Sequence, residues 1–222
     1  MNVFLIVALI FSAFEVFALQ KNLLRLEYIA KPAVMIALLF WLWTSVGLTG
    51  AGFWFGLGLV FSFVGDILLM VSLDRFFLAG LISFLFAHIS YIIGFNTPLP
   101  ALSAWGIILA VIIGINGLRL LRLILAPLAA QGQTYLRFPI SLYSTVISIM
   151  LLSALMKLSD LSWNAGAALF VSLGAGLFYL SDILLAWMKF VAPIQNGRIY
   201  NILSYHLGQI ALIAGIVLQF TP

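Results

Sequence analysis

The chain has 222 residues, of which 65% are hydrophobic and 7% are charged, so charged side chains cannot cover it as they cover a water-soluble globule. It has no cysteine, which excludes disulfides, thiolate metal sites and cysteine nucleophiles. The formal net charge of +4 comes from basic residues in loops between apolar runs, which is typical of a membrane surface and not of nucleic-acid binding. We therefore expect an integral membrane protein whose surroundings are the lipid bilayer.

Long, leucine-rich apolar runs follow one another along the chain. A membrane-spanning helix needs about 20 mostly apolar residues, and the runs lack the alternation of membrane β-strands. The first run has no basic residue before it, so we expect a retained helix and not a signal peptide. The sequence predicts an all-α polytopic membrane protein that forms a single domain over residues 1–222. Its eight predicted spans are residues 3–20, 30–47, 52–71, 76–95, 101–118, 138–156, 164–187 and 199–220.

Lysine and arginine are distributed unevenly over the two sides of the predicted spans. Nine of the ten fall on one side, and Lys157 falls on the other. The positive-inside rule assigns the nine-residue side to the cytoplasm, so both termini are expected to face away from it. The longest connection, residues 119–138, is expected to lie at the membrane interface. The nine basic residues are Lys21, Arg25, Lys31, Arg75, Arg119, Arg122, Arg137, Lys189 and Arg198.

Two segments of the chain resemble each other. The third predicted span contains Asp66 followed by Ile-Leu-Leu, and the seventh contains Asp182 followed by the same three residues, 116 positions later. The same offset relates Gly58 to Gly174. We predict two four-helix halves, roughly residues 1–100 and 101–222, in parallel orientation about an axis along the membrane normal. Such an axis puts the two aspartates at equal depth.

Asp66 and Asp182 are the acidic residues that lie well inside predicted spans. A carboxylate at bilayer depth costs about 2.5–3.5 kcal/mol on insertion scales, so it needs a partner or a role. One interpretation is a hydrogen bond between helices. The other is a shared polar cavity, in which one carboxyl keeps its proton as a general acid while the other acts as a base. Glu15, near the end of the first span, is expected to pair with Lys31 or to reach the interface.

Further polar residues lie on the predicted spans. They either form hydrogen bonds between helices or bind substrate and position water around the carboxyls. Two histidines and two aspartates can also form a zinc site, but the spacings typical of zinc sites on helices do not occur, so we expect neither a metal nor another cofactor. Lys31 is either a topology anchor or a ligand for a lipid phosphate. The candidate substrate-binding residues are Lys31, His88, Tyr91, Tyr179, Tyr205, His206 and Gln209.

The order of these motifs resembles the YhhN-like membrane proteins, the family that includes the lysoplasmalogenases. The resemblance covers almost the whole chain, although His206 has no counterpart in the pattern. The residues that carry it are Lys31-Pro32, Phe61-Ser62-x-x-Gly65-Asp66, Gly80-x-x-Ser83-Phe84-x-x-Ala87-His88-x-x-Tyr91, Gly166-x-x-x-Phe170, Ser181-Asp182 and Gln209.

The resemblance implies a hydrolase that cleaves the vinyl ether bond of lysoplasmenyl-ethanolamine or -choline. The products are a fatty aldehyde and glycerophospho-ethanolamine or -choline. It also implies a lysophospholipid substrate, no cofactor, no protein partner, and Asp66 and Asp182 as the catalytic residues. The compact loops and the resemblance together favour a bacterial inner membrane.

The residues suit this chemistry, because a protonated carboxyl can protonate the vinyl ether while an ionised one directs water, much as in glycoside hydrolysis. Two other classes of function remain open from the sequence. A small proton-coupled transporter or lipid carrier also uses carboxylates inside the membrane. A metal-dependent membrane lipid hydrolase is the third interpretation.

Overall fold

The computed structural model describes residues 2–99 and 103–221, and within them it contains helices and no strand. Eight of the described helices are long and apolar enough to cross a membrane, which confirms the predicted all-α, multi-pass integral membrane fold. The helices are α1 (Val3–Lys21), α2 (Leu24–Val46), α3 (Gly50–Val71), α4 (Phe77–Phe95), α5 (Ala104–Leu125), α6 (Arg137–Met156), α7 (Ala165–Phe190) and α8 (Gly197–Phe220). Short 3-10 helices, η1 (Ala126–Leu128), η2 (Thr134–Leu136) and η3 (Lys157–Ser159), lie before and after α6.

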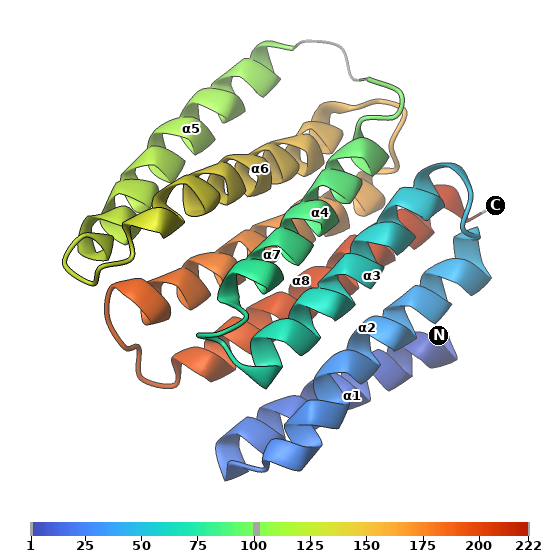
Figure 1. The fold of residues 1–222 in the computed structure, drawn as a ribbon. Coiled ribbons are helices and arrows are strands. Elements are labelled where there is room, and N and C mark those ends of the chain that lie inside the picture. The colour runs from blue at the N-terminus through green and yellow to red at the C-terminus, as the bar shows by residue number, and fades with distance from the viewer. Residues whose placement is uncertain (1, 100–102, 222) are drawn as a thin grey trace.

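Two tight hairpins form the centre of the bundle. Helices α3 and α4 form one and α7 and α8 the other, while α1–α2 and α5–α6 flank them on opposite sides (Figure 1). Each flanking pair also contacts the other half, since α2 packs on α8 and α6 packs on α4. The main apolar core lies between these helices, and a smaller cluster around Phe77 and Phe190 fills one end. This exchange of contacts is what the predicted parallel repeat would produce.

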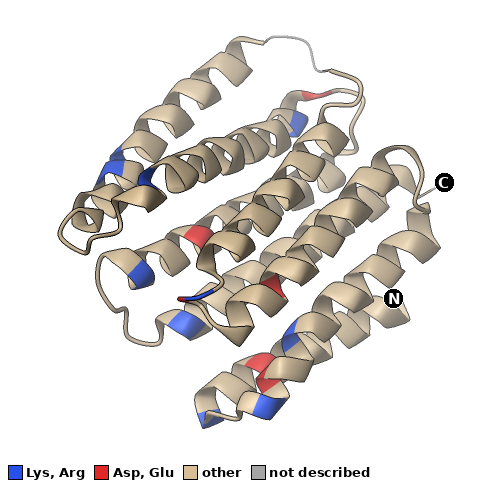
Figure 2. Ribbon diagram, viewed as in Figure 1, with Lys and Arg blue, Asp and Glu red and all other residues tan. Residues whose placement is uncertain are grey.

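The two ends of the bundle differ in charge. Most Lys and Arg residues lie at the end opposite the two termini, which we call the basic end (Figure 2). At the other end, Lys157 is 3% exposed, and its Nζ lies 3.0 Å from Oδ2 of Asp160. A hydrogen bond from the Ser162 hydroxyl, together with this ion pair, lowers the pKa of Asp160. The charge of Lys157 is therefore matched locally. A single lysine at this end still leaves the strong asymmetry in Lys and Arg from which we predict the orientation.

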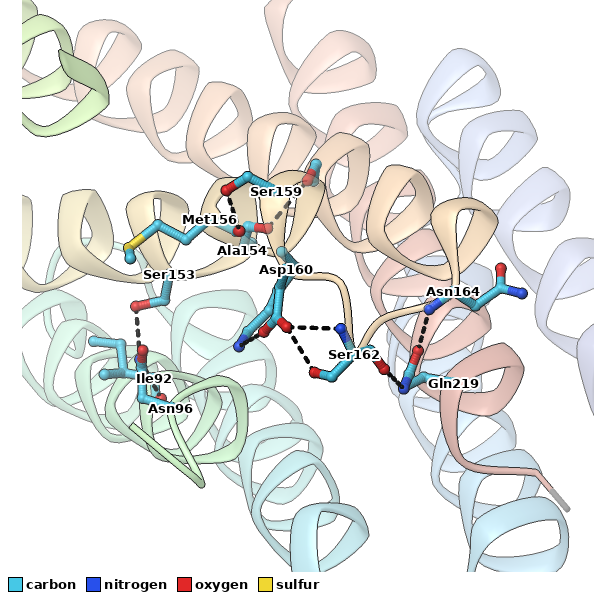
Figure 3. A network of polar contacts seen from close by, with 12 residues as sticks. Ile92, Asn96, Ser153, Ala154, Met156, Ser159, Asp160, Ser162, Asn164 and Gln219 are labelled. Carbon is cyan, nitrogen blue, oxygen red and sulfur yellow. Dashed lines mark hydrogen bonds and ion pairs between the residues drawn. The ribbon is translucent and has the colours of Figure 1, made fainter. Parts of the chain in front are cut away.

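The same end is tied together by the polar network in Figure 3. Gln219 of α8 accepts a hydrogen bond from the backbone N–H of Asn164 and donates one to the carbonyl of Ser162. On the neighbouring helices, the Asn96 amide donates to the Ser153 hydroxyl at 2.8 Å. These contacts join α4 to α6 and the α6–α7 connection to α8. A pocket of about 480 Å³ lies among the same segments, so this end of the bundle is tied together but not closed.

Glycines allow both central hairpins to pack closely. A Cβ atom at Gly58 would overlap the ring of Tyr91, and one at Gly65 would lie 2.7 Å from the ring of Phe84. In the second hairpin, a Cβ at Gly174 would lie 2.7 Å from the carbonyl oxygen of Gly208. Small residues of this kind are typical of close helix packing in membranes. Gly58 and Gly174, which the internal similarity relates, therefore serve the same purpose.

Two helices extend beyond the predicted spans, and the prediction was wrong there. Helix α2 begins at Leu24 and not at 30, so Pro32 lies inside a helix that it was expected to open. Helix α5 continues to Leu125, so residues 119–125 are helical and not part of an interfacial connection. Charged residues lower hydropathy, but arginine is a good helix former, and α5 ends only where Pro127 approaches.

The remaining predicted ends agree with the structure to within three residues. The predicted first residue of span five, at position 101, lies outside the described residues.

We predict that Gly58→Ala lowers the melting temperature of the detergent-purified protein, because the added methyl group overlaps a buried ring and overpacking costs about 1–3 kcal/mol. Gly176→Ala is the matched control, since a Cβ there meets nothing within 4 Å. The control should melt at or slightly above the wild-type temperature, because alanine favours helix by about 1 kcal/mol. Thermal unfolding monitored by size exclusion measures both, and equal melting temperatures would contradict the packing argument.

Candidate active site

A cavity of about 430 Å³ lies between α2, α3, α7 and α8 and reaches the basic end of the bundle. Asp66 and Asp182 both line it, as expected for carboxyls that share one polar space. No other acidic residue of the described spans lines it apart from Glu27, which lies near its rim. The charged residues of its wall are Glu27, Lys31, Asp66, Asp182, Lys189 and Arg198.

Asp66 is held by partners from two other helices. Its side chain is 1% exposed, and its Oδ1 lies 3.1 Å from Nζ of Lys31 on α2. The hydroxyl of Tyr205 on α8 donates a hydrogen bond to Oδ2 at 2.7 Å. One oxygen therefore faces a cation and the other accepts from a donor, an arrangement that suits an ionised carboxylate. Lys31 thus pairs with Asp66 on the wall of the cavity.

Asp182 has a different set of partners, from α6 and α4. Tyr143 donates a hydrogen bond to its Oδ2. Nε2 of His88 lies 3.0 Å from the Tyr143 hydroxyl and 3.5 Å from the same carboxylate oxygen. Because Tyr143 gives its one proton to the aspartate, its oxygen accepts from Nε2–H of His88. Both contacts fall on Oδ2, which leaves Oδ1 for a substrate or a water molecule.

Two of the predicted substrate-binding residues lie behind the cavity and do not line it. Tyr91 donates to Oε1 of Gln209 at 2.8 Å, and Nε2 of Gln209 donates to the Ser62 hydroxyl at 3.0 Å. All three side chains are buried. Ser62 lies one helical turn before Asp66, so this chain of hydrogen bonds fixes α3, α4 and α8 directly below the carboxylate.

Glu15 and His206 form a separate buried pair between α1 and α8. Oε2 of Glu15 lies 3.2 Å from Nε2 of His206, and both side chains are at most 1% exposed. The expectation that Glu15 pairs with Lys31 or reaches the interface was wrong. Consecutive residues of a helix point about 100° apart, so His206 faces α1 while its neighbour Tyr205 faces the cavity.

Several residues of the site were missed by sequence analysis. Tyr143 contacts both Asp182 and His88, but a single tyrosine in an apolar span carries no signal of such a role. At the rim, a nitrogen of Arg198 lies 2.6 Å from Glu27, and Nζ of Lys189 lies 2.7 Å from Asp74. Lys189 and Arg198 had been noted only for topology. In the structure they are the basic groups at the mouth of the cavity.

An apolar groove meets the cavity at Asp182. It runs between α4, α5, α6 and α7 and shares four lining residues with the cavity. Tyr179, one of the predicted substrate-binding residues, lines this groove, and its hydroxyl lies 3.3 Å from that of Ser148. The shared residues are Leu69, Phe84, Asp182 and Leu185.

The four-ligand zinc set that the sequence allowed is not assembled. Among the described residues, no three His, Asp or Glu side chains are grouped so that they could hold a metal ion. His88 lies at Asp182, whereas His206 lies at Glu15. The arrangement instead offers two carboxyls with unlike partners beside an apolar groove.

Comparison with known proteins identifies related sequences. Residues 26–216 match the model of the YhhN family. The chain is 29% identical over 196 residues to the Homo sapiens protein lysoplasmalogenase TMEM86A, a match that covers 83% of this chain and 77% of that protein. No solved structure gives a significant match.

We predict that Lys31→Met destabilises the protein by about 3–5 kcal/mol, because it leaves the Asp66 carboxylate buried without its cation. Adding Asp66→Asn to Lys31→Met should restore most of the loss. Lys189→Met is the control: its partner Asp74 is 94% exposed, and exposed ion pairs contribute little. Thermal unfolding in detergent measures all three variants. A double variant that is no more stable than Lys31→Met would contradict this account.

Proposed function

The chain belongs to the YhhN family, as its motifs predict, and we propose that it is a membrane hydrolase that cleaves the vinyl ether bond of lysoplasmalogens. The products are a fatty aldehyde and glycerophospho-ethanolamine or -choline. The curated relative is named as a lysoplasmalogenase, which supports the reaction class. Short loops favour the inner membrane of a bacterium as the location.

One observation carries the proposal: two aspartates inside the membrane line one cavity, and one of them also lines an apolar groove. A lysoplasmalogen likewise has a polar and an apolar part. The charged headgroup and glycerol lie on one side of the vinyl ether, and the hydrocarbon chain lies on the other. The cavity suits the polar part, with Lys189 and Arg198 at its mouth to attract a phosphate. The reactive bond then lies where the two meet, at Asp182.

The position of Asp182 favours it as the general acid. Hydrolysis of a vinyl ether begins when a proton is added to the carbon that bears the hydrocarbon chain, which leaves an oxocarbenium ion. That carbon lies on the groove side of the bond, and Asp182 is the aspartate that lines the groove. Tyr143 and His88 occupy Oδ2, so the proton is delivered from Oδ1.

Asp66 then serves as the base. Water adds to the oxocarbenium carbon and gives one proton to the Asp66 carboxylate, which is held ionised by Lys31. The negative charge of the carboxylate also stabilises the cation that forms. The resulting hemiacetal loses its hydroxyl proton to the Asp182 carboxylate as the glycerol oxygen takes one from Asp66. The carbon–oxygen bond breaks, aldehyde and alcohol leave, and both carboxyls return to their starting states.

We predict that Asp66→Asn and Asp182→Asn each lower aldehyde release from a lysoplasmalogen by about 100-fold or more, the range for loss of a general acid or base. Asp160→Glu, at the opposite end of the bundle, keeps a carboxylate for Lys157 and should retain wild-type turnover. Matched ester-linked and alkyl-ether lysolipids should stay intact. Product analysis by mass spectrometry measures aldehyde release by the three variants and the fate of each lysolipid.

Well-folded Asp66→Asn and Asp182→Asn variants with normal turnover would refute the mechanism. Intact vinyl ether after incubation with folded wild-type protein would refute the reaction and favour a lipid carrier. Loss of activity on chelation would favour the metal-dependent hydrolase.

The protonation step predicts an isotope signature. In D₂O, the aldehyde should carry one deuterium on the carbon next to the carbonyl, because that carbon receives the proton from Asp182. Rapid reduction to the alcohol prevents later exchange, and mass spectrometry then reports the label. An aldehyde without deuterium at that carbon would show that the bond is broken by another route.

A further inference from the structure

We propose that the hydrocarbon chain of the substrate lies in a continuous groove that runs from Asp182 along α5 and α6, and that this groove admits a single chain and sets the preferred chain length. The inference rests on the proposed function for the identity of the lipid. The path itself follows from three adjoining spaces in the structure.

The first part of the path is the apolar groove that begins at Asp182. Its open volume of about 80 Å³ is small compared with about 430 Å³ for the polar cavity. Its walls come from α4 and α7 on one side and α5 and α6 on the other. A space of this size accommodates the first few methylene groups of one chain.

The second part of the path continues between α5 and α6. A further groove of about 330 Å³ lies there, and it shares Leu121 and Ser144 with the first groove. Gly114 and Gly117 of α5 line it. The helix surface is open at Gly114, where a methylene chain would lie, whereas the hydroxyls of Ser148 and Tyr179 pack against Gly117. The polar cavity adjoins the first groove, and the first groove adjoins the α5–α6 groove, through these shared lining residues.

Helix α5 is suited to leave such a space. Only Gly106, Gly117 and Ile124 of this helix are buried, and its main partner is α6 (Figure 1). A Cβ at Gly114 would meet nothing within 4 Å. Lipid tails are as apolar as the groove, so moving a chain into it brings little hydrophobic gain. The groove therefore selects among lipid substrates by the length of hydrocarbon chain that fits in it.

The polar cavity explains why one chain and not two enters. A second chain on the same glycerol would have to lie on the cavity side of the reactive bond, against Lys31, Asp66 and Arg198. These charges are paired inside the protein, and hydrocarbon placed against them displaces water from the polar cavity without offering a polar contact, which is unfavourable. The chemical class that fits is a single-chain lipid with a phosphate headgroup.

The test is a substitution that shortens the groove at its far end. Gly114→Phe fills the α5–α6 groove from a helical position at which a Cβ is unobstructed. We expect kcat/KM for a long-chain alkenyl lysolipid to fall about 10-fold, while kcat/KM for a short-chain analogue is unchanged. Gly176→Phe on α7 is the matched control, because a Cβ there is equally unobstructed and the residue lines neither groove. An unchanged chain-length preference in Gly114→Phe would overturn the proposal.

A binding experiment separates this inference from the proposed reaction. An alkyl-ether lysophosphoethanolamine with a photoreactive group at the chain end cannot be hydrolysed at a vinyl ether. We expect it to label α5 and α6 in the wild type and in Gly176→Phe, and not in Gly114→Phe. If the wild-type protein is labelled at this site but releases no aldehyde from a lysoplasmalogen, the proposed reaction is refuted and the inference that the groove binds the hydrocarbon chain stands. Equal labelling by a two-chain analogue would show that the label reports ordinary contact with bilayer lipid, and it would overturn the inference that the groove binds a single chain.

Discussion

A carboxylate inside a membrane protein must be matched by a cation or a hydrogen-bond donor, and this requirement at two aspartates organises the bundle. Asp66 on α3 takes its partners from α2 and α8. Asp182 on α7 takes its partners from α6 and α4. Each aspartate thus uses the second helix of its own half and the fourth helix of the other half. The polar contacts therefore join the two predicted halves, while the parallel repeat itself stays a prediction.

The two sites share a plan but differ in chemistry. Asp66 faces the ammonium group of Lys31, whereas Asp182 faces a phenol and an imidazole. A fixed cation favours an ionised carboxylate at Asp66, whereas the contacts of Asp182 fall on one oxygen and leave the other open to a substrate or water. The two aspartates hold corresponding places in the two predicted halves, and the residues around them make those places unequal. That inequality is what general acid and base roles in the proposed reaction require.

The sequence allowed the helices and the two aspartates to be predicted because both follow from the cost of polar groups in lipid. Long apolar runs predict the spans. A carboxyl inside a span indicates a functional or paired group, because its insertion into lipid is costly. Tyr143 could not be found in this way, because a tyrosine is common in membrane helices and its role depends on a helix 39 residues away in sequence. The partner of Glu15 was mistaken for the same reason, since pairing between α1 and α8 is a property of the packing. Hydropathy also ended α5 too early, at arginines that continue the helix.

The site lies where water, charge and hydrocarbon meet, and this position bears on how a lipid could be hydrolysed without leaving the bilayer. The cavity reaches the basic end, which provides a route for water and for a polar product. The groove opens sideways between helices that expose apolar side chains, which suits a hydrocarbon product that returns to the membrane. In the proposed reaction, the bond that separates a polar from an apolar product lies at Asp182, which borders both spaces, so each product leaves in its own direction.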